Sequence, residues 1–315
     1  MILPRLMYKK AKSINDAIQL FQKNNGNTFY LAGGTDIVPQ VKLRLHAIDM
    51  LIDLKAIKEL TGISVRDGWL SIGANTTLFE IKNHSQVREY FPALFQSLDA
   101  TSCETLQMRG TIGGNILQNT RCLFYNKSLE WRKAKGFCFK MGGETCNVVP
   151  NAKACFANYC SDNAPSLLSL SAEVSLLGIN GGRRIKLEEI FSGNSKTPFT
   201  ILQGEILTAI HIPLRKTKGA YEKLRVRDSI DYPLVSAAFT LENGKGLLSI
   251  GAIGARPFLY SLDNMNENTV QDVMERIYND SKPVANTILP ASYRKKMARI
   301  LAKRVITNVL REAHS

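Results

Sequence analysis

The chain has 315 residues, of which 44% are apolar and 22% are charged, an ordinary composition for a globular protein with two or three domains or subdomains. No segment approaches the roughly 20 consecutive apolar residues that a membrane span needs, and residues 1–5 lack the apolar core of a secretory signal. We therefore expect a cytoplasmic protein, in which clustered cysteines serve metals or redox chemistry more often than disulfides.

Hydrophobic periodicity and turn residues predict an α+β fold without internal repeats. Ser13 is placed to cap the first helix, which Asn25-Gly26 would end, and Arg66-Asp67-Gly68 is a hairpin signal. In chain order, we expect helices over 13–25, 78–83, 85–98, 164–171, 270–279 and 291–313, and strands over 28–32, 50–54, 63–65, 69–72, 173–179, 183–187, 206–212, 221–226, 234–241 and 247–253. The longer strands after residue 220 predict a domain boundary near 213–219.

Two glycine-rich turns each follow an apolar stretch: Gly33-Gly34-Thr35 and Gly113-Gly114-Asn115. Glycine amides approach a phosphate closely because no Cβ intervenes. Two such loops would hold a dinucleotide from both sides, although glycine pairs also form plain turns. Neither loop has the G-x-G-x-x-G spacing of a βαβ unit, so a Rossmann nicotinamide site is not indicated.

Five of the six cysteines lie between residues 119 and 160. Cys122, Cys138, Cys146 and Cys155 are 16, 8 and 9 positions apart, and Cys160 follows. This spacing differs from the C-x-x-C pairs of a zinc ribbon. The segments between the cysteines are rich in Gly, Lys and Asn, so a metal would be their only core. Iron–sulfur or zinc would suit four thiolates, while free buried thiols and disulfides remain alternatives.

Other polar residues give weaker signals. Cys103 lies in a segment of core character and is expected to be buried. Asp162, at the end of the cysteine segment, would either cap the next helix or accept a hydrogen bond from a flavin or ribose. The four histidines are scattered without the spacing of a nucleophile–base pair or a metal site, so hydrolase chemistry is not indicated; they are His46, His84, His211 and His314.

The net charge is +14, and two segments concentrate it, residues 121–140 and 294–311. Such charge binds nucleic acid, an acidic protein or a phosphorylated small molecule, or it forms a solvated face or a subunit contact. Neither segment has the interleaved aromatic residues of a single-strand binder, and no zinc-finger or helix-turn-helix pattern is present. Nucleic-acid binding is therefore not favoured.

Three segments together carry a resemblance to a known family: 31–36 (LAGGTD), 107–115 (QMRGTIGGN) and 161–165 (SDNAP). The chain resembles the FAD-binding medium subunits of the xanthine dehydrogenase family of molybdenum enzymes over essentially its whole length. Most members run directly from the Gly-Gly-Asn turn to the Ser-Asp segment. The insertion at about 119–160 is similar to that of the β subunit of 4-hydroxybenzoyl-CoA reductase, where the loop binds an additional [4Fe–4S] cluster.

The resemblance implies a role for each matching residue. Cys122, Cys138, Cys146 and Cys155 would be the cluster ligands, with Cys160 a bystander near the flavin. The residues implied to bind FAD are Leu31, Ala32, Gly33, Gly34, Thr35, Asp36, Thr76, Thr77, Thr111, Gly114, Asn115, Asp162 and Lys223. Because no histidine falls in either glycine loop, non-covalent FAD is expected.

The resemblance also implies architecture and partners. Residues 1–215 would be a FAD-binding (PCMH-type) domain with two subdomains, about 1–55 and 56–215. Residues 216–315 would be an α+β domain of the CO dehydrogenase flavoprotein type. A large subunit would carry the molybdenum cofactor and a small one two [2Fe–2S] clusters, in a heterohexamer. This chain would relay electrons from ferredoxin toward molybdenum, where 4-hydroxybenzoyl-CoA loses its phenolic hydroxyl. No catalytic residue for the substrate is expected here.

Two alternatives compete with this reading. The first is the flavin subunit of another xanthine dehydrogenase-type hydroxylase or reductase, acting on a different aromatic or N-heterocyclic substrate. The second is a zinc-stabilised basic module that binds nucleic acid. A yellow-brown protein would exclude the second alternative, and a colourless one would favour it.

Overall fold

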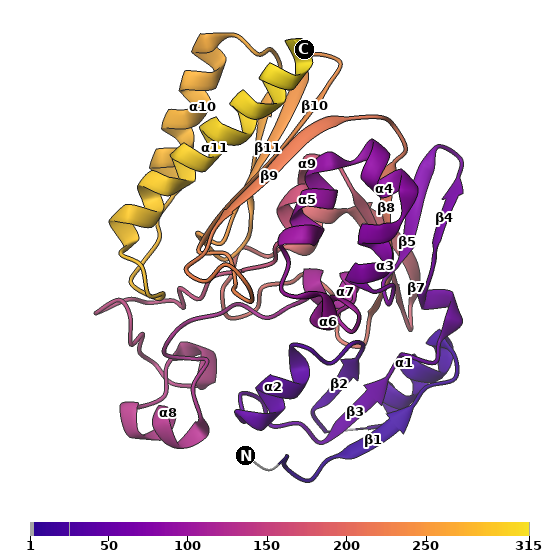
Figure 1. Cartoon of the computed structure of the whole chain (residues 1–315). Helices are drawn as coiled ribbons and strands as arrows, with labels where there is room; N and C mark the ends of the chain where they lie inside the picture. Colours follow the sequence, from indigo (N-terminus) through magenta and orange to yellow (C-terminus); the bar gives the residue numbers. More distant parts are fainter. Residues whose placement is uncertain (1–2, 25, 315) are drawn as a thin grey trace.

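The computed structural model describes residues 3–24 and 26–314. In Figure 1 three sheets follow one another from the N-terminal part at the bottom to the C-terminal part at the top. Helices pack beside each sheet, which confirms the predicted α+β class. The domain limits given above, 1–215 and 216–315, stay a prediction.

The N-terminal part is a three-stranded parallel sheet in the order β1-β3-β2. Its elements are β1 (Met7–Lys10), α1 (Ile14–Lys23), β2 (Thr28–Leu31), α2 (Ile37–Lys42) and β3 (Met50–Asp53). The Ser13 hydroxyl caps α1 by accepting a hydrogen bond from the Asp16 amide at 3.1 Å, as predicted. The predicted end at Asn25 lies outside the described residues.

The middle part is a five-stranded antiparallel sheet in the order β4-β5-β8-β6-β7. Its strands are β4 (Ile63–Arg66), β5 (Trp69–Gly73), β6 (Glu173–Gly178), β7 (Gly181–Lys186) and β8 (Ile206–Pro213). Its helices are α3 (Leu78–Asn83), α4 (Ser85–Tyr90), α5 (Pro92–Ala100), α6 (Glu104–Gln107), α7 (Ile112–Ile116) and α9 (Asn163–Ser169), with short 3₁₀ turns at Lys58–Leu60 and Leu187–Ile190. One buried apolar cluster joins strands and helices.

The helix predicted over 85–98 is in fact two helices. Phe91 leaves the helical region with φ −129° and ψ 66°, and α5 begins at Pro92. Proline suits a first helical position because it lacks an amide hydrogen, and it disfavours a helical residue before it. The break lets α5 turn and pack against α9 and β9.

The segment with the cysteines projects from the rest of the molecule at the lower left of Figure 1. It contains α8 (Leu129–Lys135) and a 3₁₀ turn at Phe139–Met141, and none of its described residues belongs to the three sheets. An irregular segment of this length needs its own anchors, because it has little apolar surface to bury.

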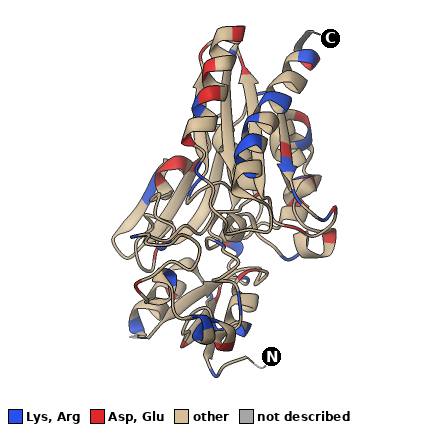
Figure 2. Ribbon diagram, turned by 90° about the vertical axis from the view of Figure 1, so that its left-hand side faces the viewer, with Lys and Arg blue, Asp and Glu red and all other residues tan. Residues whose placement is uncertain are grey.

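The C-terminal part is a four-stranded antiparallel meander in the order β12-β11-β10-β9. Its elements are β9 (Lys218–Leu224), β10 (Val235–Glu242), β11 (Lys245–Gly251), β12 (Phe258–Leu262), α10 (Glu267–Asp280) and α11 (Ala291–His314). The two helices lie on one face (Figure 1), and Lys and Arg residues recur along the helix that ends near the C-terminus, α11 (Figure 2). Among the described residues, no helix has the length and apolar character to cross a membrane.

Candidate functional site

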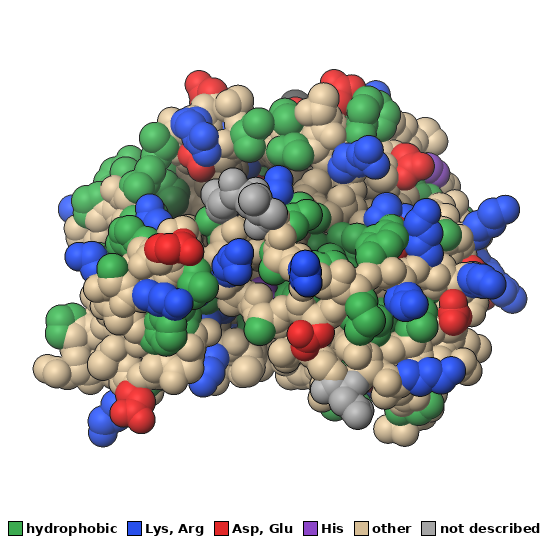
Figure 3. Space-filling view, turned by 90° about the horizontal axis from the view of Figure 1, so that it is seen from below, with side chains coloured by type: hydrophobic (Ala, Val, Ile, Leu, Met, Phe, Trp, Pro, Cys, Tyr) green, Lys and Arg blue, Asp and Glu red, His purple; other side chains and the backbone are tan. Residues whose placement is uncertain are grey.

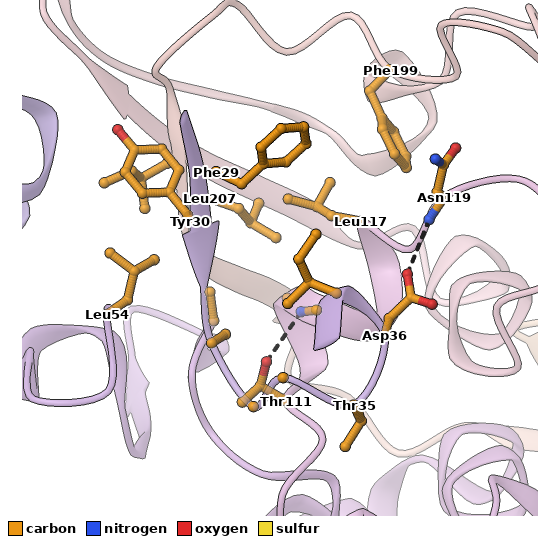
Figure 4. A pocket seen from close by; sticks show the side chains of 18 of the residues that line it. Phe29, Tyr30, Thr35, Asp36, Leu54, Thr111, Leu117, Asn119, Phe199 and Leu207 are labelled. Atoms are coloured by element: carbon orange, nitrogen blue, oxygen red, sulfur yellow. Dashed lines mark hydrogen bonds between the residues drawn. The ribbon is translucent and has the colours of Figure 1, made fainter. Parts of the chain in front are cut away.

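A cavity of about 410 Å³ lies between the N-terminal sheet and the middle part (Figure 4). Its apolar walls come from segments far apart in the sequence, among them Phe29, Leu117, Phe199 and Leu207. Its other side carries the first glycine-rich turn, residues 32–36. The volume and the mixture of apolar walls with a few polar groups are typical of a cofactor site.

The two glycine-rich turns meet in the structure, as the sequence predicts. Gly33 packs so closely on the second loop that an added Cβ would lie 1.8 Å from the Arg109 carbonyl oxygen. Gly34 has φ +79°, a conformation that favours glycine. Only glycine at position 33 allows this approach, which exposes the backbone of residues 32–36 to the cavity.

The second loop forms the start of α7. The Thr111 hydroxyl accepts a hydrogen bond from the Gly114 amide at 3.1 Å, and Gly113 lies against Ala74, with its hypothetical Cβ 2.8 Å from that carbonyl oxygen. Asn115 accepts hydrogen bonds through Oδ1 from the Ser161 hydroxyl and the Asn163 amide group, at 2.6 and 3.1 Å. This network joins the glycine loop to the segment that follows the cysteines.

A second cavity, of about 150 Å³, extends the first toward the C-terminal sheet. The two cavities share Thr35, Asp36, Thr111 and Gly114, and the second continues to Asn115, Asp162 and the loop after β9. An elongated ligand would cross the glycine turns at its middle, with one end in the apolar first cavity and the other among the mainly polar residues of the second. A dinucleotide has that shape.

Asp162 forms a buried polar cluster at the inner end of the second cavity. Its Oδ1 accepts hydrogen bonds from the Lys223 ammonium and the Tyr221 hydroxyl, each at 2.9 Å. Burial raises the pKa of Asp162, and the nearby Lys223 charge opposes the shift. Asp162 precedes α9 without a side-chain capping bond, so the helix-cap alternative is wrong. The cluster places a charged pair beside the cavity wall.

Four of the predicted FAD-binding residues do not line either cavity, and one of them, Lys223, donates its hydrogen bond to Asp162. The Thr76 hydroxyl bonds to the backbone of Gly62, accepting from its amide and donating to its carbonyl. Thr77 caps α3 in a capping box with Glu80, and Leu31 is buried. Their contacts in the structure are thus with the protein itself, and their predicted part in FAD binding stays a prediction.

The cavities also involve residues that the sequence did not single out. Asp36 accepts hydrogen bonds from the Gln40 side chain at 2.5 Å and from the Asn119 amide at 3.4 Å (Figure 4). The Gln40 oxygen in turn faces His46 Nε2 at 2.8 Å. No local sequence pattern marks Gln40 or His46. Their contacts with Asp36 and with the chain near residue 119 form only when α2 and the turn after it pack against that part of the chain.

We expect the stability of the protein to fall in mild acid because of His46. Burial and the nearby charges of Lys140 and Arg132 lower the pKa of His46 from 6.5 to about 4. Because its pKa is lower in the folded state, this histidine takes up a proton in the unfolded chain at a higher pH than in the folded protein. The folded state therefore loses stability as pH falls from above the unfolded pKa toward the folded pKa. Between pH 7 and pH 5 the loss is about 2 kcal/mol. Urea unfolding at both pH values should show a smaller decrease for His46→Gln than for the wild type; equal decreases would contradict the prediction.

Four cysteines converge on one small cavity, of about 20 Å³: Cys122, Cys138, Cys146 and Cys155. All four are half-buried and free. Among the described residues no group of three His, Cys, Asp or Glu is arranged to hold a single metal ion.

The other two cysteines lie outside this cavity. Cys160 is buried, and burial raises the pKa of its thiol to about 11. Cys103 is half-exposed rather than buried as predicted, because it precedes α6 at a turn. Its hydrogen bond with Thr105 lowers the pKa of its thiol.

Two basic residues of the cysteine segment point inward. Arg132 is buried and donates to the carbonyl oxygens of Leu43 and Arg44, at 3.0 and 2.6 Å. Lys140 donates to Asn119 at 2.7 Å and to the Ser195 carbonyl at 2.9 Å. These bonds anchor the segment beside the cavity. The sequence had placed both residues in a basic patch with solvated or subunit-contact faces as alternatives, and the structure assigns them a structural role.

Comparison with known proteins agrees with this geometry. A family model described as "FAD binding domain in molybdopterin dehydrogenase" matches residues 4–215. The chain is 29% identical to the aldehyde oxidoreductase FAD-binding subunit of Escherichia coli, over 98% of each chain. It is 27% identical to the carbon monoxide dehydrogenase medium chain of Afipia carboxidovorans, over 95% of this chain and 94% of that one. Carbon monoxide dehydrogenase from Hydrogenophaga pseudoflava has the same fold, with a TM-score of 0.79 at 22% identity, over 98% of this chain and 99% of that chain.

Proposed function

Because the chain belongs to the family of FAD-binding medium subunits of molybdenum hydroxylases, we propose that it is the electron-transfer subunit of a molybdenum-containing reductase and carries a [4Fe–4S] cluster beside its FAD. The convergence of Cys122, Cys138, Cys146 and Cys155 on one cavity carries this proposal. The segment that holds them lies outside the three sheets, as expected of a local device added to a flavin-binding fold.

The residues present fit both groups. For FAD, the Gly33 position leaves no room for a Cβ, and the two cavities share the residues of the glycine turns, with an apolar chamber on one side and a more polar one on the other. For the cluster, the donor set is four thiols, the ligands that iron–sulfur clusters prefer. When bound, the two groups supply storage and transfer of electrons.

The chain's own residues would orient the flavin and exclude water from it. Backbone groups of residues 32–36 and 111–115 would hold the pyrophosphate, since the close contact of Gly33 with Arg109 brings the two turns together beside the cavities. The pair of Asp162 and Lys223 would contact the ring. A cation with a carboxylate partner can favour one protonation state of a ring edge, which is how a protein tunes a cofactor.

We propose 4-hydroxybenzoyl-CoA as the substrate of the complete enzyme, reduced to benzoyl-CoA on a large molybdenum subunit, with a small subunit that carries two [2Fe–2S] clusters. The cysteine-lined cavity supports this choice over an ordinary flavin subunit. The relatives include an aldehyde oxidoreductase and carbon monoxide dehydrogenases, so a related enzyme acting on another substrate is the second candidate. Benzoyl-CoA formation by the purified complex, measured with reduced ferredoxin as donor, separates the two.

The proposed cofactors are tested by an absorption spectrum of anaerobically purified protein, with iron and acid-labile sulfide counted per FAD. We expect about four irons per FAD and a broad shoulder beyond the flavin bands. Flavin without iron would contradict the cluster and return the chain to the ordinary flavin subunits. A colourless protein would contradict both cofactors.

The exposed lysines of the cysteine segment are the proposed docking site for an acidic ferredoxin. Lys127, Lys133 and Lys135 are exposed. Figure 3, from below, shows more basic than acidic side chains across that face of the molecule. Basic patches accelerate encounter with acidic partners in a salt-dependent manner.

Neutralising two of these lysines is expected to slow reduction by ferredoxin. In Lys133→Gln/Lys135→Gln the rate should fall by about tenfold at low ionic strength, and its dependence on salt should flatten. Stopped-flow reduction of the flavin measures this rate. The control Lys58→Gln/Lys245→Gln removes the same charge at exposed positions outside the segment and should stay near the wild type. An unchanged rate at low salt in the first variant would contradict the docking site.

A further inference from the structure

Arg121 joins the cysteine segment to the flavin cavity. It directly precedes Cys122, and its backbone pairs with Asn158 on the returning chain: each amide donates to the other residue's carbonyl, at 2.7 and 2.8 Å. The two ends of the cysteine segment are therefore fixed together at Arg121. A shift of Cys122 or of the returning chain at Asn158 would therefore act directly on this residue.

The Arg121 side chain leaves the cysteine segment and contacts two other parts of the chain. One guanidinium nitrogen lies 3.4 Å from Asp36 Oδ1, and the guanidinium carbon lies 3.9 Å from the centre of the Tyr232 ring. Asp36 lines both cavities and Tyr232 lines the second. Arg121 thus contacts the first glycine-rich turn, in the N-terminal part, and the β9–β10 loop of the C-terminal part.

The ion pair of Arg121 with Asp36 affects how the first glycine-rich turn would hold a phosphate. A carboxylate at Asp36, beside the turn that would hold a pyrophosphate, repels a phosphate unless a cation offsets it. The Arg121 guanidinium is the cation in contact with it. Because Cys122 follows Arg121 and the Arg121 backbone is paired with Asn158, an ordered cysteine site would hold Arg121 where it neutralises Asp36.

We propose that Arg121 is a positioning residue that couples the two cofactor sites, so that a filled cysteine site tightens FAD binding and bound FAD tightens the cysteine site. The coupling rests on the proposed function, because it requires both cofactors. By linkage the effect is equal in both directions, and a coupling of ordinary size changes each affinity by about tenfold.

The experiment measures the FAD dissociation constant of the full-length chain in iron-free and iron-reconstituted forms, by quenching of flavin fluorescence. In the wild type we expect FAD to bind about tenfold more tightly to the iron-reconstituted form. In Arg121→Gln the ratio should fall below about twofold while iron content stays near the wild-type value. Arg121→Lys keeps the charge but loses the planar stacking, and should give an intermediate ratio.

Two matched pairs protect the test against misfolding. Tyr232→Leu removes the ring under Arg121 while leaving every residue of the cysteine segment unchanged, and it should reduce the ratio. Tyr232→Phe keeps a ring face and should preserve the ratio. Arg227→Gln removes a charge at the same cavity, from a side chain that pairs with Asp231, and should also preserve the ratio. A ratio near one in the wild type, or an unchanged ratio in Arg121→Gln, overturns the coupling while leaving the two cofactors in place. Absence of iron from reconstituted wild type overturns the proposed cluster itself, and the coupling with it.

Discussion

Replacing Cys122 with serine is expected to reduce the iron content from about four per FAD to well below one. Cys122 lines the shared cavity with the other three cysteines, and burial raises the pKa of its thiol. In the proposed cluster, coordination to iron would supply the free energy that keeps this sulfur ionised. A serine hydroxyl is a harder and much more basic ligand, which suits iron–sulfur chemistry poorly. Flavin should still bind, with an affinity lowered by no more than the roughly tenfold coupling proposed above, because Cys122 lines neither of the two cavities proposed to hold FAD.

The other cysteines provide matched controls for this substitution. Cys160→Ser and Cys103→Ser change the same atoms outside the cavity, and both variants should retain iron. Iron and sulfide are counted after anaerobic purification, with the flavin absorbance as the internal reference. Equal iron in Cys122→Ser and the wild type would exclude Cys122 as a ligand. Loss of iron in Cys160→Ser as well would indicate a ligand set different from the proposed one.

Much of the fold could be predicted because its elements carry local signals. The hairpin at Asp67-Gly68 has both residues at positive φ, 51° and 77°, which their sequence favours. Strands β5, β6, β8 and β10 follow runs of apolar or alternating residues and lie close to their predicted limits. Several elements were missed, and two of them have weak local patterns: β1 is exposed at all its residues, and α2 is short and contains Pro39. The short helices α6, α7 and α8 and the edge strand β12 were missed as well.

The site was predicted in part for the same reason. The paired glycines and the cluster of cysteines within one segment are unusual in composition, so the sequence alone directs attention to them. Contacts such as Arg121 with Tyr232 join residues that only the tertiary fold brings together. No periodicity or spacing connects them. Thr76 shows the opposite case, a residue expected at the cofactor whose hydroxyl bonds to Gly62 in the protein.

The largest expected effect on FAD binding is that of Gly33→Ala. An alanine Cβ at this position would lie 1.8 Å from the Arg109 carbonyl oxygen and 2.7 Å from its carbon, distances that no rotation of a side chain relieves, since both atoms belong to the backbone. The two loops must separate, and the backbone groups that would face the pyrophosphate separate with them. We expect FAD affinity to fall by about 100-fold, equivalent to about 3 kcal/mol.

A second glycine shows whether the effect comes from this contact or from glycine loss in general. Gly182 lies in β7, and a Cβ there would meet its nearest atoms, in Leu177 and Leu176, at 3.5 and 3.6 Å, an ordinary contact. Gly182→Ala should therefore bind FAD like the wild type. Titration of flavin-free protein gives both affinities, and circular dichroism reports whether each variant is folded. A folded Gly33→Ala that binds FAD with wild-type affinity would show that the loops do not need their close approach, and that the cofactor is held elsewhere.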